Sequence, residues 1–276
     1  MYGGGETALL YTATGLAEKG HHVVLCGNVK KGIDAGIHLA DKAALPALLQ
    51  EYWDVLITCD DPSIFQVRPR AIIKIADFAC NHFNIGELDK IIDYYTVRSD
   101  WHARQIRRAD RSASVEKFMV LPYAIDPKFY GDGVEKEPYS IIYASSPDRG
   151  LHHLLRFFPK IKEAVPEATL HVFYNIKPAF DGTKWMMDDI AEEMWQVYRG
   201  LVTHPSPGVI YHGAYPVSEL SKWMQRCELL LYPCDTIVPT EGFSITIAAA
   251  FAGKEAVLLS DCDCLNEVWG KYSAVL

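Results

Sequence analysis

The chain has 276 residues, 49% of them hydrophobic, and a formal net charge of −8. This length allows one large domain or two domains of ordinary size. The negative charge gives no reason to expect a nucleic acid as a partner. The sequence has no run of about 18 apolar residues, and its start lacks the basic and apolar regions of a secretory signal, so we expect neither a transmembrane segment nor a signal peptide.

The apolar pattern alternates between two kinds of segment along the whole chain. Short apolar runs predict strands at residues 22–26, 54–59, 71–76, 94–97, 118–121, 140–144, 169–174, 209–212, 229–232 and 256–259. Stretches between most of them predict helices at residues 7–19, 42–52, 86–92, 100–109, 151–164, 184–201, 217–226 and 244–252. Apolar strands separated by helices are typical of an α/β protein with doubly wound parallel sheets.

Residues 126–139 interrupt this alternation, because glycine, proline and charged residues dominate there and no period is left. We therefore predict a Rossmann-like domain at residues 1–126, a linker at 127–139 and a second Rossmann-like domain at 140–276. A cleft between two such domains is the default position for a ligand.

The seven cysteines are odd in number and lie mostly in strand-like runs. Buried reduced thiols explain this better than a disulfide framework does, and they indicate a cytoplasmic protein. Cys262 and Cys264 lack the usual spacing of zinc ligands and have no second pair, so we expect no metal site.

Three loops lie where a ligand of a doubly wound protein would bind. The first is Gly3, Gly4, Gly5 and Glu6, which precedes a helix. Glycines allow the backbone to approach a ligand closely, and a helix N-terminus favours an anion. A flexible N-terminus is the alternative interpretation, and both stay open.

The second loop, residues 145–150, carries Ser145, Ser146 and Arg149 between a strand and a helix. Hydroxyl groups, a guanidinium and a helix start together suit a phosphate group. The alternative is an ordinary helix start, with serine or aspartate as the cap and proline in the first turn.

The third loop is the most informative. Glu241 precedes a small-residue turn and a helix that ends at Gly253. The backbone N–H groups at the helix start would point at an anion, and the Glu241 carboxylate beside them suits sugar hydroxyls better than a phosphate. The alternative is that Glu241 caps the helix.

At this point the chain resembles the group-one (family 4) retaining glycosyltransferases of the GT-B fold, most strongly from Ser140 to Glu267. The supporting segments are residues 141–151, 209–213, 260–261 and 265–268, with residues 99–102 and 120–126 in the first half. The most specific one is the E-x7-E segment of the family, whose first glutamate is Glu241.

The resemblance implies a retaining, metal-independent transfer of a sugar from a nucleotide-diphosphate sugar to an acceptor hydroxyl, with no cofactor. The acceptor would be a glycan, a lipid or a protein, and peripheral membrane contact is compatible with it. The implied catalytic residues are Glu241, Asp77 and His82, and Gly3, Gly4, Gly5 and Glu6 would lie on the acceptor side. The implied donor-binding residues are Ser145, Ser146, Arg149, His212, Gly213, Gly242, Phe243, Ser244, Ile245 and Thr246.

The chain also departs from the family pattern. Ala249 replaces the second glutamate of E-x7-E, which would cost about 1.5–3 kcal/mol of donor binding if nothing replaces its hydrogen bond. Ala144 stands where the family has a basic residue. The family's histidine–aspartate pair is matched by Ala76 and Asp77, so the histidine is absent or displaced to His82. Two alternatives therefore stay open: a non-catalytic nucleotide-sugar-binding protein, or a nucleotide-sugar epimerase on the same fold.

The family also has a strand before the glycine-rich loop and helices after residue 267. We therefore expect a sequence truncated at both ends, with the first sheet lacking its central strand. Residues 272–276 read as one more strand.

Overall fold

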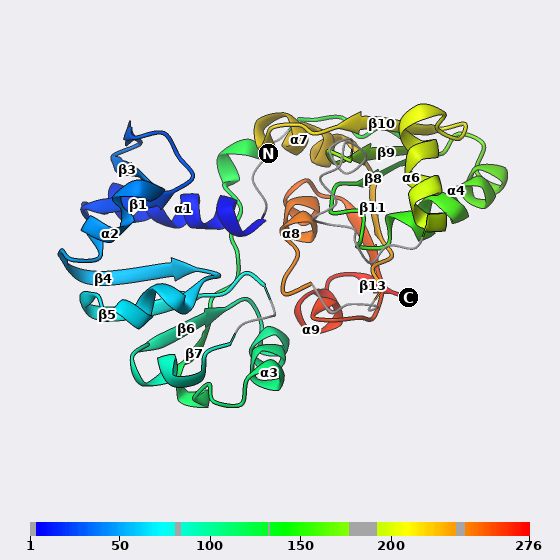
Figure 1. Cartoon of the computed structure of the whole chain (residues 1–276). Helices are drawn as coiled ribbons and strands as arrows, with labels where there is room; N and C mark the ends of the chain where they lie inside the picture. The colour runs from blue at the N-terminus through cyan, green and yellow to red at the C-terminus, as the bar shows by residue number, and fades with distance from the viewer. Residues whose placement is uncertain (1–3, 81–83, 132, 177–191, 236–240) are drawn as a thin grey trace. The chain divides into compact units, whose positions relative to one another are not determined.

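The computed structural model describes residues 4–80, 84–131, 133–176, 192–235 and 241–276. They form two compact units, one ending at Tyr123 and the other running from Ala124 to Leu276 (Figure 1). Both units are α/β, and most of their strands pair in parallel. In the described part of the chain, no helix is long and apolar enough to cross a membrane.

The first unit begins with helix α1 and a small three-stranded sheet. Its elements are α1 (Gly4–Glu18), β1 (Val23–Gly27), β2 (Gly32–Asp34), β3 (Ile37–Asp41), η1 (Lys42–Ala44) and α2 (Leu45–Leu48). The strand order is β1-β3-β2, with β1 parallel and β2 antiparallel to β3.

The rest of this unit is a four-stranded sheet in which every neighbouring pair is parallel. Its elements are β4 (Tyr52–Cys59), η2 (Pro62–Val67), β5 (Arg70–Asp77), η3 (Gly86–Lys90), β6 (Tyr94–Val97), α3 (Asp100–Ala109), η4 (Val115–Lys117) and β7 (Phe118–Val120). The order β4-β5-β6-β7 follows the chain. Cys59, Asp77 and Thr96 are aligned by the register, so the ends of three strands meet at one edge.

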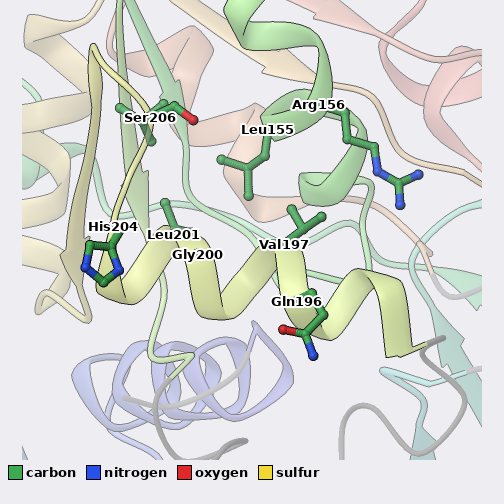
Figure 2. A pocket seen from close by; sticks show the side chains of 9 residues that line it. Leu155, Arg156, Gln196, Val197, Gly200, Leu201, His204 and Ser206 are labelled. Atoms are coloured by element: carbon green, nitrogen blue, oxygen red, sulfur yellow. The ribbon is translucent and has the colours of Figure 1, made fainter.

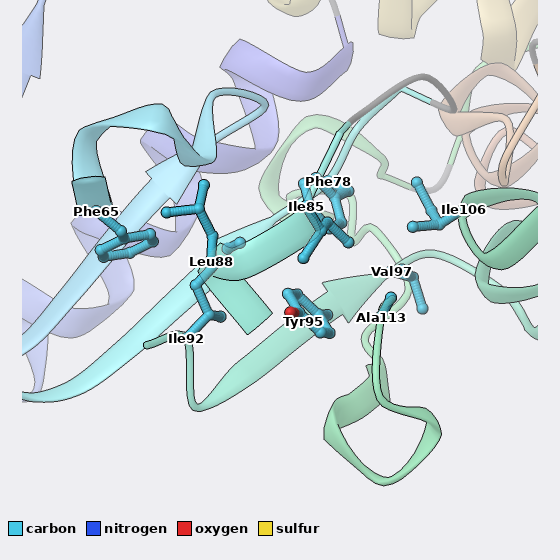
Figure 3. Close-up of a cluster of buried hydrophobic side chains, with 10 residues drawn as sticks. Phe65, Phe78, Ile85, Leu88, Ile92, Tyr95, Val97, Ile106 and Ala113 are labelled. Atoms are coloured by element: carbon cyan, nitrogen blue, oxygen red, sulfur yellow. The ribbon is translucent and has the colours of Figure 1, made fainter. Parts of the chain in front are cut away.

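A buried hydrophobic cluster holds this unit together (Figure 3). Its ten buried members are Phe65, Ala76, Phe78, Ile85, Leu88, Ile92, Tyr95, Val97, Ile106 and Ala113. Phe78 and Tyr95 stack with their ring centroids 5.9 Å apart. The Tyr95 hydroxyl donates a 2.7 Å hydrogen bond to Asp89, which satisfies the one polar atom of that side chain.

The second unit contains a six-stranded parallel sheet in the order β10-β9-β8-β11-β12-β13. Its elements are η5 (Pro127–Phe129), β8 (Ser140–Tyr143), α4 (Leu151–Ala164), β9 (Thr169–Phe173), α6 (Glu192–Thr203), β10 (Val209–Gly213), α7 (Val217–Arg226), β11 (Leu229–Tyr232), α8 (Ile245–Ala252), β12 (Ala256–Leu259), α9 (Leu265–Trp269) and β13 (Ala274–Val275). Helices α4 and α6 lie together on one side of this sheet, and α7 and α8 lie on the other (Figure 1). This is the doubly wound arrangement that right-handed crossovers produce.

Most of the segment predicted as a linker packs on helix α7. The Gly131 N–H donates to the side-chain oxygen of Gln225 at 2.8 Å, and the Glu137 N–H donates to the Arg226 carbonyl at 2.8 Å. The Lys136 ammonium donates to the Cys227 and Gly253 carbonyls. These contacts place Gly131, Lys136 and Glu137 in the second unit.

The structure corrects several predicted elements. Residues 42–52 form two short turns and then enter β4, instead of one long helix, and residues 86–90 form a 3-10 helix. Strands β2 and β3 were not predicted, because β2 has three exposed residues and no apolar run. Of the helix predicted at 184–201, the described part is α6, which begins at Glu192 and extends to Thr203.

Candidate functional site

The strand order of the second unit itself marks a candidate binding region. From β8 the chain moves through α4 to β9, and from β11 it moves through α8 to β12 in the opposite direction along the sheet. The loops after the adjacent strands β8 and β11 therefore diverge to opposite faces. Ligands of open α/β sheets bind at such a switch point, outside the carboxyl ends of the strands. Both informative loops of the sequence, at residues 145–150 and around Glu241, leave these two strands.

Gly150 holds the first loop against the second. Its backbone is left-handed, with φ of 82°, and it is the N-cap of α4 without any side-chain cap. A Cβ atom on Gly150 would lie 1.8 Å from the Pro233 carbonyl oxygen. Only glycine allows this approach. The alternative of serine or aspartate as the helix cap is therefore wrong, and the loop is shaped by close backbone packing.

The centre of the site is an ion pair between Arg149 and Glu241. The side chains are 19% and 8% exposed, so the pair is largely removed from water. Burial disfavours the charged guanidinium, but Glu241, with Tyr232 and Asp148 adding to it, outweighs this and raises the pKa of Arg149 well above its usual value. The sequence assigned Arg149 to a phosphate and Glu241 to a sugar. The structure pairs these two side chains with each other.

Tyr232, the last residue of β11, completes this network and was not predicted as a site residue. Its hydroxyl donates to Glu241 at 2.7 Å and lies 2.9 Å from the Ser145 hydroxyl. Tyr232 is fully buried, which raises the pKa of its phenol well above the usual value and keeps it a donor. The signal in the sequence was a hydroxyl-bearing residue at the carboxyl end of a central strand.

The start of α8 is strained. Ser244 has φ of 70°, which is unusual for a residue with a side chain, and it caps the helix by accepting from the Ile247 N–H at 3.4 Å. Glu241 accepts from the Phe243 N–H at 3.4 Å in the turn before the helix, and the cap of α8 is Ser244, so the alternative of Glu241 as the helix cap is wrong. Thr246 donates to the Ala144 carbonyl at 2.9 Å, which joins this helix to the end of β8.

Two polar atoms of the 145–150 loop are buried without a hydrogen-bond partner in the described residues: the Ser146 hydroxyl and one carboxylate oxygen of Asp148. Burying such atoms unpaired costs about 1–3 kcal/mol each. Orphaned polar atoms beside a buried arginine indicate that this loop is prepared for a polar ligand.

His212 and Gly213 lie at the end of β10, on the other side of β9 from the switch point. The His212 ring stacks on Phe173 at a centroid distance of 4.3 Å, and its Nε2 is 3.0 Å from Nδ1 of His171. Burial, with His171 adding to it, lowers the pKa of His212 to about 4, so the ring is neutral at pH 7. In the described part of the unit, the His212 ring contacts the rings of His171, Phe173, Tyr215 and Trp223.

Ala249 lies in α8 and is 8% exposed. It places no polar group at the position where the resemblance expects a second glutamate. Ala144 offers its carbonyl to Thr246 instead of a basic side chain to a ligand. At both positions where the sequence departs from the family pattern, the structure therefore has no polar side chain to offer a ligand.

The first unit gathers a second set of polar residues at its strand ends. Asp77 pairs with Arg98, whose side chain is 4% exposed, and accepts from Thr96 on the neighbouring strand. The Arg98 guanidinium lies 4.2 Å from the centroid of the Tyr123 ring. Asp77 is thus held in a buried ion pair.

The glycine-rich start of α1 approaches the same strand ends. A Cβ atom on Gly5 would lie 2.8 Å from that of Ala79 and 3.8 Å from the Tyr123 hydroxyl. The acceptor-side residue Gly5 therefore lies close to the segment that follows Asp77. Gly4 is the first residue of α1; the side chain of Glu6 and the whole of Gly3 and His82 lie outside what the structure describes.

Asp60 was missed by sequence reasoning. It follows β4 with a left-handed φ of 61°, and its carboxylate accepts from the Ala79 and Cys80 N–H groups at 2.7 and 3.0 Å. Burial, reinforced by Asp77, raises the pKa of Asp60 despite these hydrogen bonds. A strained carboxylate at a strand end is a functional signal that appears only in the structure.

A pocket in the second unit lies elsewhere, between α4 and α6 (Figure 2). Arg156, Gln196 and His204 supply its polar groups, and Leu155 and Val197 line it from the two helices. None of the predicted donor-binding residues lines this pocket.

No family model and no curated protein matches the sequence. Solved structures do match. The sucrose-phosphate synthase from Thermosynechococcus elongatus aligns with a TM-score of 0.75 and 13% identity, over 99% of this chain and 80% of that one. AviGT4, a glycosyltransferase involved in avilamycin A biosynthesis, aligns with a TM-score of 0.70 and 15% identity, over 100% of this chain and 76% of that one. HepE from Anabaena, in complex with UDP-glucose, aligns with a TM-score of 0.68 and 13% identity, over 100% of this chain and 82% of that one.

The chain therefore has the GT-B fold, with two Rossmann-like units. This confirms the predicted fold class. At 13–15% identity the likeness extends to the fold, and the chemistry has to be argued from the site.

Proposed function

We propose that the protein transfers a sugar from a nucleotide-diphosphate sugar to an acceptor hydroxyl, with retention at the anomeric carbon and without a catalytic metal ion. The observation that carries this proposal is the buried Arg149–Glu241 pair at the switch point, beside the orphaned Ser146 hydroxyl. The similar structures support it, since they include glycosyltransferases and a UDP-glucose complex.

In this proposal the Arg149 guanidinium has five N–H donors, of which Glu241 uses only part, so it can bind a diphosphate while it stays paired. Glu241 keeps a carboxylate oxygen near the ligand for the sugar hydroxyls. Ser145, Ser146 and the start of α8 supply further donors. In the first unit, Gly5, Asp77 and His82 are proposed for the acceptor.

During transfer, the bond between the anomeric carbon and the diphosphate oxygen breaks, and its electron pair goes to the diphosphate. The acceptor oxygen bonds to the anomeric carbon on the same face, and its proton passes to the departing diphosphate. Arg149 and the N-terminus of α8 stabilise the growing negative charge. Positioning and electrostatics carry this reaction, which needs no protein nucleophile.

The second candidate is a nucleotide-sugar-binding protein without turnover. Ala249 favours it, because a buried alanine offers no hydrogen bond to a donor ribose. The seven free cysteines support the predicted cytoplasmic location for either candidate, because a reducing compartment keeps thiols unpaired.

The test is calorimetric titration of UDP and GDP sugars into the wild-type protein and into Glu241→Gln, which keeps the shape of the side chain and removes its charge. Glu219→Gln, on the exposed face of α7, is the matched control. We expect micromolar binding to the wild type and the control, and at least about tenfold weaker binding to Glu241→Gln.

Turnover separates the two candidates. Release of the free nucleotide diphosphate in the presence of an acceptor, with the product's anomeric configuration read by NMR, supports the retaining transferase. Binding without turnover supports the second candidate. If no nucleotide sugar binds to the wild type, both candidates fail.

A further inference from the structure

Three metal-ligating side chains converge next to the loop that follows β11. His152 and His153, in the first turn of α4, and Asp235, after β11, each direct one ligand atom toward a common point, and these atoms lie within 4.8 Å of one another. The sequence did not single out any of them. The chemistry described under the proposed function leaves all three unused.

In the described structure His153 and Asp235 are joined by a hydrogen bond, and His152 lies next to them. The Asp235 oxygen Oδ2 lies 2.7 Å from Nε2 of His153 and 3.5 Å from Nε2 of His152. In a tetrahedral zinc site with ligand bonds of about 2.1 Å, neighbouring ligand atoms are about 3.4 Å apart. The 3.5 Å distance from Asp235 to His152 already fits this value. The 2.7 Å distance from Asp235 to His153 lengthens by roughly 0.7 Å when the partly exposed His153 ring turns away from the carboxylate.

The backbone holds these ligands in place. Gly150, two residues before His152, packs directly on the Pro233 carbonyl, two residues before Asp235. The Tyr198 hydroxyl of α6 donates to the Pro147 carbonyl at 2.7 Å and secures the same loop from a third element. The first turn of α4 and the segment after β11 are therefore kept side by side, as a metal site built from two elements requires.

The three side chains of the cluster differ in how far they are exposed to solvent. The side chain of His152 is 4% exposed, while those of Asp235 and His153 are 26% and 37% exposed. The centroids of the His152 and His153 rings lie 3.9 Å apart, at an interplanar angle of 42°. The Nε2 atoms of both rings face the same oxygen, Oδ2 of Asp235, and share it, His153 at 2.7 Å and His152 at 3.5 Å. A cation between the three atoms satisfies all of them, with an open position toward solvent.

We propose that His152, His153 and Asp235 bind a divalent first-row transition ion, with zinc as its natural occupant. Two imidazole nitrogens and one carboxylate oxygen suit zinc, whereas magnesium and calcium favour sites made of oxygen ligands. The ion takes no part in sugar transfer. It links the first turn of α4 to the segment that leads toward Glu241, and so stabilises the second unit.

The test uses the untagged, full-length protein, freed of metal by a chelator and titrated with zinc in a calorimeter. We expect one ion per chain. Binding weakens by at least about tenfold in His153→Ala and in Asp235→Asn, and stays unchanged in the exposed controls His204→Ala and Asp261→Asn. Zinc at about 100 times its Kd raises the Tm of the wild type by roughly 5 °C, and raises that of Asp235→Asn much less.

Cobalt(II) identifies the ligands independently of affinity. A visible d–d spectrum without a sulfur-to-cobalt charge-transfer band is expected for two histidines and an aspartate. Cys234 and Cys262 are the competing ligands, since the Cys262 thiol lies 3.4 Å from the Cys234 carbonyl oxygen. Zinc binding that survives in both His153→Ala and Asp235→Asn, or that is abolished in Cys234→Ser, overturns the proposal, as does the absence of binding to the wild type.

This inference does not rest on the proposed function. A protein that binds no nucleotide sugar can still bind zinc here, and a transferase with a vacant His152–His153–Asp235 cluster can still turn over.

Discussion

At the residue scale, the Arg149–Glu241 pair has two roles, one in stability and one in ligand binding, that make different demands on its contacts. As a buried pair it satisfies two charges that the fold removes from water. As a candidate donor site, Arg149 must present its remaining N–H donors to a ligand while it stays paired with Glu241. Tyr232 reduces this conflict, because its hydroxyl keeps Glu241 in position when Arg149 turns to a phosphate.

The first prediction concerns the stability of this pair. Glu241→Ala removes the nearer of two carboxylates that pair with the largely buried Arg149 guanidinium, the other being Asp148 at 3.5 Å, so we expect a loss of about 3–5 kcal/mol in the free energy of unfolding, measured by urea denaturation. The double variant Arg149→Met/Glu241→Leu removes both charges and is expected to recover most of that loss. The control is Glu219→Ala, which breaks the exposed pair with Lys222 and is expected to cost at most about 0.5 kcal/mol. Equal losses in Glu241→Ala and the control would contradict the buried pair.

The second prediction concerns Glu255, which is 5% exposed and has neither carboxyl oxygen paired in the described structure. Burial raises its pKa to about 9, and the more distant Lys136 only partly opposes this. A carboxyl whose pKa is higher in the folded state costs no stability at pH values below its pKa in the unfolded chain, which is about 4.5. The cost grows as pH rises toward 9, because the unfolded chain ionises first.

Glu255→Gln is therefore expected to raise the free energy of unfolding by roughly 2–3 kcal/mol at pH 8 and to change it little at pH 4.5. Denaturation at both pH values measures this, with the exposed Glu163→Gln on α4 as the control. If Glu255→Gln raised the free energy of unfolding equally at both pH values, burial of the charge would not be the cause of the increase.

At the scale of single elements, the site depends on how α4 and α8 begin. Both helices start at a residue with positive φ: α4 at Gly150, which has no side-chain cap, and α8 at Ser244, whose hydroxyl caps the helix. Both conformations bring the backbone of the β8 and β11 loops together, which places Arg149 beside Glu241.

The third prediction tests this arrangement. Gly150→Ala is expected to destabilise the protein by about 2–4 kcal/mol and to weaken donor binding, because its Cβ would overlap the Pro233 carbonyl and its φ of 82° disfavours a side chain. Gly200→Ala is the matched control, since α6 leaves open space around Gly200 and alanine favours a helix. It is expected to stabilise by roughly 0.5–1 kcal/mol. A Gly150→Ala variant as stable as the wild type would disprove the close backbone packing.

At the scale of the whole molecule, the chain consists of two units with separate cores. Phe78 is fully buried in the core of the first unit, and Phe158, on the buried face of α4, is fully buried in the second. Chains of two such units often depart from two-state unfolding.

The fourth prediction follows from this separation. Phe78→Ala is expected to lower the stability of the first unit by about 3–5 kcal/mol and to leave the transition of the second unit in place, while Phe158→Ala does the reverse. Scanning calorimetry of the two variants and the wild type measures both transitions. A single transition that shifts equally in both variants would show that the two cores unfold as one.

The sequence by itself determined the α/β class, eleven of the strands and the two loops that meet at the switch point. These features are local, because apolar periodicity and glycine or proline breaks act over a few residues. It missed β2, which is exposed and has no apolar run, and β3, which is only five residues long. It also predicted helices at residues 42–52 and 86–92, where the structure has the short segments η1 and α2 and the 3-10 helix η3.

Only the tertiary structure decided which side chains meet. Arg149 and Glu241 are 92 residues apart, and His153 and Asp235 are 82 apart. Their contacts exist because the strand order reverses between β8 and β11, which brings two distant loops to one edge. A sequence shows the chemistry that each residue can supply, and strand order and backbone packing determine its partners.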